Sequence, residues 1–186
     1  MLFLSAGHYK KDPGAVANGV QENNLTIELR NLIVIELQKL GKIIEKDFKI
    51  DNDNWDLRTY LANIHTGSGS VVFEIHFDSA SSSTATGTTM IIPAREWTRE
   101  FIIEQQFGKE IVDVCSTVLG IKNRGVIDET ESHRGRLGLM RESGINGLLE
   151  VCFISNSNDL KAFNQYKQIL AARIAPILIK YDNLKS

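Results

Sequence analysis

The run GLLEVCFI, at residues 147–154, is the most apolar stretch of the chain and contains one charged residue, Glu150. A continuous apolar run of this length is typical of a strand covered on both faces, as in the interior of a parallel sheet. An unpaired carboxylate there would cost several kcal/mol. Glu150 is therefore expected to pair, to bind a metal or to have a raised pKa, unless the strand lies at an edge and turns it to solvent.

Shorter apolar runs and helical periodicity alternate along the rest of the chain. Strands are predicted at residues 2–6, 42–46, 71–76 and 88–92, with a brief extended segment at 137–141. Helices are predicted at residues 24–40, 55–65, 98–119 and 159–181. We expect Asp53 or Asn54 to cap the second helix and Pro176 to bend or break the last one. This alternation predicts an α/β fold, a single domain over residues 1–186 with a twisted, mostly parallel sheet flanked by helices on both faces.

Composition excludes several classes of partner. The 186 residues carry a formal net charge of −2, and their Lys and Arg side chains are scattered, which argues against nucleic acid and anionic membranes. No apolar run approaches the ~20 residues of a membrane span. Cys115 and Cys152 fall in apolar patterns and are expected to be buried and reduced. Nothing indicates oligomerisation, so a monomer is the default.

Two histidines follow predicted strands, where ligands of parallel sheets gather. His8 comes just after residues 2–6, and His76 ends the run at 71–76. Together with Glu22 as a third metal ligand and Glu150 as a further carboxylate that handles protons, they make up the set of residues found in a catalytic zinc hydrolase. A lone histidine is more often a structural hydrogen-bonding residue, and Glu22 stands where a carboxylate favours a helix N-terminus, so both simpler roles stay open. We do not expect the other two histidines, His65 and His133, to join the metal.

Four short motifs extend this pattern over residues 2–160. They are Gly7-His8 with KDPGAV at residues 11–16, then Glu22, then Ile75-His76, and finally LLEVCFISN at residues 148–156. In this order they resemble the zinc-dependent N-acetylmuramoyl-L-alanine amidases of the Amidase_3 type. The chain departs from that pattern next to the motifs, notably at residues 5–6 and 9–10.

The resemblance implies a role for each candidate residue. Zinc is expected on His8, Glu22 and His76, with Glu150 as the catalytic carboxylate. The bond implied joins N-acetylmuramic acid to L-alanine, which makes peptidoglycan the partner. Three further residues, Arg141, Asp78 and Asn156, are expected to contact the substrate or to support the metal ligands. Arg141 could reach substrate carboxylates or Glu150, since its guanidinium suits carboxylates, and a surface ion pair is the simpler alternative.

The biological setting implied is that of a phage or prophage endolysin. Residues 1–5 lack the features of a secretory signal, so we expect a protein that is cytoplasmic as synthesised and meets the cell wall after release. A host autolysin would need export, with a leader outside this sequence. Two other functions share the features: a catalytically silent peptidoglycan-binding module, and a zinc peptidase or deacetylase that acts on another bond.

Overall fold

The structure, a computed structural model, describes residues 1–132 and 135–184. Its strands are β1 (Leu2–Ala6), β2 (Val16–Ala17), β3 (Val20–Gln21), β4 (Phe48–Ile50), β5 (Val71–Asp78), β6 (Thr88–Ile92), β7 (Asn123–Asp128) and β8 (Ile145–Phe153). Its α-helices are α1 (Glu22–Lys39), α2 (Leu57–Asn63), α3 (Phe101–Leu119) and α4 (Ser157–Asp182). Two short 3₁₀ helices, η1 (Arg95–Trp97) and η2 (Leu139–Arg141), complete the set.

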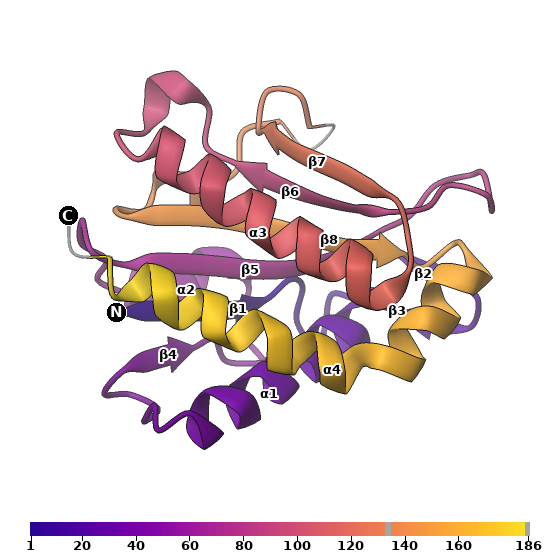
Figure 1. Cartoon of the computed structure of the whole chain (residues 1–186), viewed down its shortest axis with the longest axis horizontal. Helices are drawn as coiled ribbons and strands as arrows, with labels where there is room; N and C mark the ends of the chain where they lie inside the picture. The colour runs from indigo at the N-terminus through magenta and orange to yellow at the C-terminus, as the bar shows by residue number, and fades with distance from the viewer. Residues whose placement is uncertain (133–134, 185–186) are drawn as a thin grey trace.

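A six-stranded sheet organises the molecule, in the order β4-β1-β5-β8-β6-β7 (Figure 1). All neighbouring pairs are parallel except β6 and β8, which run antiparallel. β8 is thus inserted between β5 and β6, two strands that precede it in the chain. The predicted mostly parallel sheet is confirmed, and the run that contains Glu150 lies in its interior rather than at an edge.

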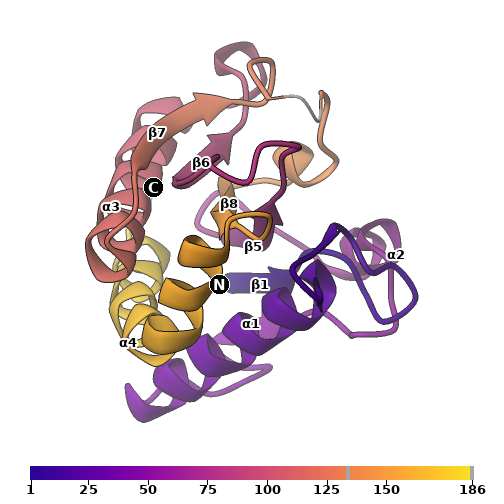
Figure 2. The same ribbon diagram turned by 90° about the vertical axis from the view of Figure 1, so that its right-hand side faces the viewer.

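Helices cover both faces of the sheet, as predicted. Alternation along β1 shows why: Leu2 and Leu4 pack with the core beneath α1, α3 and α4, whereas Phe3 packs on the opposite face with Tyr60 of α2 and Met140 of η2. Figure 2 shows α1, α3 and α4 together on one side and α2 on the other. Among the described helices, none has the length and apolar character of a membrane span. Both cysteines are buried and free, as expected.

Two predicted extended segments are wrong. Residues 42–46 do not form a strand: Ile44 makes only an isolated bridge with Phe48, and the chain turns at Glu45, which has a positive φ of 63°. The strand follows at β4. Residues 137–141 close into turns that end in η2, where the Arg141 N–H donates to the Gly138 carbonyl at 3.0 Å. Positive φ and i→i+3 bonding are both incompatible with extended backbone.

Other local predictions also need correction. The last helix does not break at Pro176 and continues to Asp182, since neighbours such as Ile174 and Leu178 are buried in the core and their packing offsets the cost of the proline. Asp56 caps α2, accepting from the Thr59 N–H at 2.7 Å, instead of Asp53 or Asn54. The strand β7 and the β2–β3 hairpin were not predicted.

Candidate metal centre

The loop after β1 carries His8 and is held by the first turns of α1. Thr26 Oγ1 donates to the Gly7 carbonyl at 2.7 Å, and Asn23 Nδ2 donates to the Tyr9 carbonyl at 3.1 Å. His8 has a φ of 65°, a left-handed conformation uncommon for any residue other than glycine. Such conformations persist where the surroundings enforce them, often at functional sites. The two hydrogen bonds supply that enforcement.

Glu22, the first residue of α1, directs its carboxylate to groups outside its helix. Oε1 lies 2.9 Å from His76 Nδ1 and accepts from the Phe77 N–H at 3.0 Å, and Oε2 accepts from the Ala15 N–H at 2.9 Å. The carboxylate thereby joins α1 to the carboxyl end of β5. Its side chain is 2% exposed and serves these contacts rather than a helix cap.

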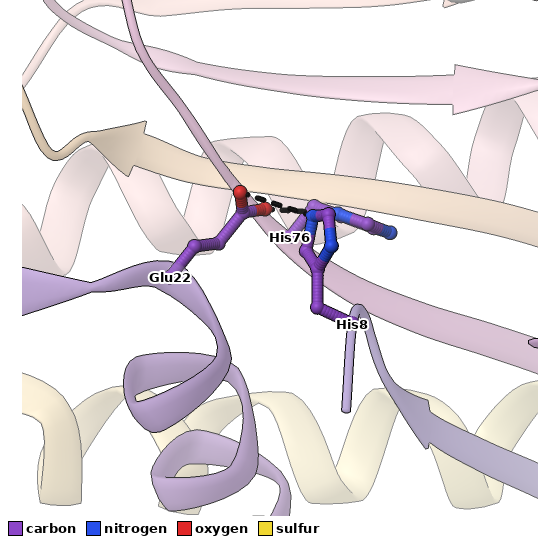
Figure 3. Close-up of side chains that lie close together, drawn as sticks. All are labelled: His8, Glu22 and His76. Atoms are coloured by element: carbon purple, nitrogen blue, oxygen red, sulfur yellow. Dashed lines mark hydrogen bonds and ion pairs between the residues drawn. The ribbon is translucent and has the colours of Figure 1, made fainter. Parts of the chain in front are cut away.

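His8, Glu22 and His76 converge from the first loop, α1 and β5 (Figure 3). Each offers a ligand atom, and these atoms lie within 4.8 Å of one another. The two imidazole rings are 5.0 Å apart and inclined at 78°, while His8 Nε2 is buried, makes no hydrogen bond and lies 3.1 Å from Glu22 Oε2. Outside the cluster, His65 is exposed; His133 lies outside the described residues.

The three groups perturb one another's pKa. Burial alone would raise the pKa of Glu22, but its contacts with the imidazoles of His76 and His8 outweigh burial and hold that pKa well below its usual range. Burial opposes the charged form of His76, yet its contacts with Glu22 and Glu74 raise its pKa to about 10. The pKa of His8 is raised for the same reason, by Glu22 and Asp12 against burial. The protein thus surrounds the site with negative charge, which suits a cation.

The outer nitrogen of each histidine meets a carboxylate that sequence reasoning had not assigned a role. His8 Nδ1 lies 2.8 Å from Asp12 Oδ2, and His76 Nε2 lies 3.3 Å from Glu74 Oε1. Carboxylates in this position orient histidine ligands at metal sites. Strand alternation was the available signal for Glu74, two residues before His76 and so on the same face.

Gly14 leaves room for two of the candidate ligands, His8 and Glu22. Its φ is 63°, and a Cβ at this position would lie 2.6 Å from His8 Cδ2 and 2.7 Å from Glu22 Oε2. No side chain fits there without moving His8 or Glu22. The Pro13-Gly14 turn therefore matters by its lack of a side chain as well as by its direction.

Glu150 lies beside His76 on the neighbouring strand. The two residues are register partners in the parallel pairing of β5 with β8, so they share a face, and Glu150 is 5% exposed. A cleft of about 480 Å³ opens there. Its lining comprises Asp78, Thr89, Ile91, Lys122, Asn123, Arg124, Ile127, Glu131, Ser132 and Glu150.

The other three predicted residues lie in different places. Asp78 lines the cleft together with Glu150. Arg141 binds Glu129, with 2.6 Å between Nη1 and Oε1, and its guanidinium lies 5.1 Å from the Trp97 ring. Asn156 caps α4, where Oδ1 accepts from the backbone, and it is 8% exposed. The geometry thus gives Arg141 an ion pair and Asn156 a structural role.

The sequence of residues 2–180 matches the model of the Amidase_3 family, described as N-acetylmuramoyl-L-alanine amidase. The chain belongs to this family. Its members include enzymes that share the sheet described above. A curated relative, the probable autolysin PH of Staphylococcus aureus, is 26% identical over 199 residues. That match covers 93% of this chain and 38% of the relative, so the chain spans well under half the relative's length.

Solved amidase structures show the same fold. An N-acetylmuramoyl-L-alanine amidase from Clostridium difficile 630 superposes with a TM-score of 0.77 at 20% identity, covering 100% of this chain and 97% of the other. The catalytic domain of an endolysin targeting Clostridium difficile gives 0.68 at 15% identity, with 96% of each chain covered. Both structures share the fold of this chain.

Proposed function

We propose that this family member uses zinc to hydrolyse the amide bond between N-acetylmuramic acid and L-alanine in peptidoglycan. One observation carries the proposal: His8, Glu22 and His76 bring three ligand atoms within 4.8 Å, and Glu150 is the register partner of His76. Family membership indicates which bond is cut. The arrangement provides a metal centre and a separate carboxylate on adjoining strands.

The residues present fit a zinc ion. Two imidazoles and a carboxylate are a donor set found in catalytic zinc sites, and His8 Nε2 is a buried nitrogen without a hydrogen bond that faces the other two ligands. His8 Nε2, His76 Nδ1 and the Glu22 carboxylate would hold the metal. When bound, zinc lowers the pKa of water to near 7 and polarises a carbonyl group.

Glu150 would handle the protons. Its carboxylate shares a face with His76 and lines the cleft, so a peptide carbonyl that reaches the metal also reaches Glu150. Glu150 Oε takes a proton from the attacking water and delivers it to the departing nitrogen of L-alanine, a role that requires hydrogen-bond reach to both atoms.

The cleft would take the stem peptide. Lys122 and Arg124 line it on the side of β7, and cations of this kind suit peptide carboxylates. Asp78 lies in the same cleft and is placed to accept hydrogen bonds from a peptide backbone. Arg141 reaches the substrate in this proposal only if it leaves Glu129.

Defined muropeptides test the proposal. The purified protein should release stem peptide with a new L-alanine N-terminus, and this release should stop with a chelator and in Glu150→Gln. Glu96→Gln is a matched control, because Glu96 is exposed in η1 and is not among the residues that line the cleft. Cleavage elsewhere in the stem peptide or deacetylation of the glycan would indicate the alternative hydrolases, and binding without turnover would indicate a silent binding module.

We further propose that the protein acts on the cell wall after release from the cell in which it is made. The name of the autolysin relative supports a lytic role. A bacterium that makes the protein in its cytoplasm should grow normally and lyse once its membrane is permeabilised, whereas the Glu150→Gln variant should not lyse. Lysis without permeabilisation would contradict this setting.

A further inference from the structure

A buried carboxylate outside the metal-ligand set contacts His76. Glu74 precedes His76 by two residues on β5, so both side chains lie on the face that also carries Glu150. Glu74 is 2% exposed and His76 is 6% exposed. A carboxylate in the middle of an apolar strand is costly unless it has a partner. Glu74 contacts the ring of His76, with 3.3 Å between Oε1 and Nε2.

The His76 ring is held from both sides. Nδ1 lies 2.9 Å from Glu22 Oε1 and points into the ligand cluster, while Nε2 points away from the cluster to Glu74. A neutral imidazole has one N–H and one lone pair, and a metal takes the lone pair. If Nδ1 is the ligand, the proton must lie on Nε2, where Glu74 accepts it.

The same arrangement is found at His8 with the two nitrogens exchanged. His8 Nε2 faces Glu22, and its Nδ1 lies 2.8 Å from Asp12 Oδ2. Each histidine therefore has one nitrogen toward the shared centre and a carboxylate on the other. Two unrelated segments place a carboxylate against a histidine in this way. The contact between Glu74 and His76 is therefore part of how the candidate metal site is arranged and does not result only from close packing on β5.

We propose that Glu74 is a positioning residue that fixes the proton of His76 on Nε2 and presents Nδ1 to the metal. The proposal rests on the zinc site proposed above and adds a residue to it. Gly7 supports the same ring orientation, because a Cβ there would lie 2.3 Å from His76 Cε1, so the ring packs flat against the glycine. Turning the ring over would move Nδ1 away from Glu22 and Nε2 away from Glu74.

Zinc affinity measures this role without any substrate. Competition with a chromophoric chelator should show that Glu74→Leu weakens zinc binding roughly 10- to 100-fold, the usual effect of losing such a carboxylate. Glu74→Gln should weaken it less, because the amide oxygen still accepts from Nε2–H. Glu104→Gln is the matched control: Glu104 is also a fully buried glutamate, it accepts from the Asn146 N–H, and it lies outside the ligand cluster.

The tautomer of His76 gives a direct readout. In ¹⁵N-labelled zinc-loaded protein, His76 should carry its proton on Nε2, and that proton should exchange faster with solvent in Glu74→Gln. A His76 protonated on Nδ1, or an affinity unchanged in both variants, would overturn the role of Glu74. Zinc binding by the parent without muropeptide cleavage would instead overturn the proposed reaction and leave the role of Glu74 intact.

Discussion

The two histidines of the metal centre lie in different kinds of structure. His8 is on a loop, has a left-handed backbone, and its side chain is 18% exposed with a partner, Asp12, that is 48% exposed. His76 is on β5 inside the sheet, and its side chain and that of Glu74 are 7% and 3% exposed. One half of the site is thus built on a partly exposed loop and the other on a buried strand.

Because of this difference, the two halves of the site contribute to metal binding in different ways. The β5 half supplies a ligand whose position is set by strand pairing and by two buried carboxylates, Glu22 and Glu74. The loop half supplies a ligand that is more exposed to solvent. A metal that enters from solvent would meet His8 first, and the buried ligands would then complete its coordination.

The largest expected effect belongs to Glu22, which connects the halves. Glu22→Ala removes the carboxylate that both rings contact and the acceptor of the Ala15 and Phe77 N–H groups. We expect stoichiometric zinc binding and amidase activity to be lost together, as measured by metal analysis and muropeptide assay. A variant that retains one zinc per chain would show that the halves bind the metal independently.

The next effect distinguishes the two histidines by stability. In the presence of a chelator, His76→Ala removes the partner of the buried Glu74 carboxylate and one contact of Glu22, and should lower the free energy of unfolding by about 3–5 kcal/mol, as for a broken buried pair. His8→Ala should cost about 1 kcal/mol, since its partner Asp12 is half-exposed. Urea denaturation measures both, and equal losses would contradict the difference between the halves.

Gly14 tests the loop half alone. Gly14→Ala forces a Cβ against His8 and Glu22, so zinc affinity should fall by roughly tenfold or more, as when support for a ligand is lost. Gly19→Ala is the control, because its φ of 76° imposes similar strain while a Cβ there meets nothing within 4 Å. Both should lose roughly 1–2 kcal/mol of stability from strain. Equal zinc affinities in the two variants would contradict the role of Gly14.

The smallest effect is on pH dependence in the metal-free protein. The pKa of His76 is raised from 6.5 to about 10, so its stabilising contribution is complete below about pH 6.5 and is lost as the pH rises toward 10. The lowered pKa of Glu22 acts oppositely: its contribution is present above about pH 4.5 and is lost on acidification. Urea midpoints should therefore fall between about pH 6.5 and 10 in the parent and in His8→Ala.

Comparison with His76→Ala isolates this contribution. Other groups titrate in the same range, such as Glu104, whose burial raises its pKa to about 7, and they are shared by all the variants. The alkaline loss should be smaller in His76→Ala than in the parent. The same slope in both proteins would show that His76 is not the group responsible.

Sequence reasoning predicted the buried half of the fold better than the rest. Apolar runs marked β1, β5, β6 and β8 because these strands are covered on both faces. β7 was missed because it begins with Asn123 and Arg124 and contains Gly125, none of which favours a strand. β4 was placed too early because the turn through Glu45 depends on a positive φ that an apolar pattern does not report.

Prediction of the candidate site from the sequence was limited in the same way. His8, His76 and Glu150 stand out because each is polar at the end of, or within, an apolar strand, and their meeting follows from parallel topology. Asp12 and Glu74 could not be assigned, since their role depends on which ring nitrogen faces the cluster. That orientation is set by tertiary packing, including contacts at Gly7 and Gly14, and not by spacing along the chain.

The insertion of β8 between β5 and β6 has a consequence for biosynthesis. All three candidate metal ligands lie within the first 76 residues, whereas Glu150 belongs to the last strand, which must enter the middle of the sheet. Such non-local pairing forms late, because long loops must close first. A chain still on the ribosome would therefore have its metal ligands but lack its proton carrier, so hydrolytic capacity would arise only as the sheet is completed.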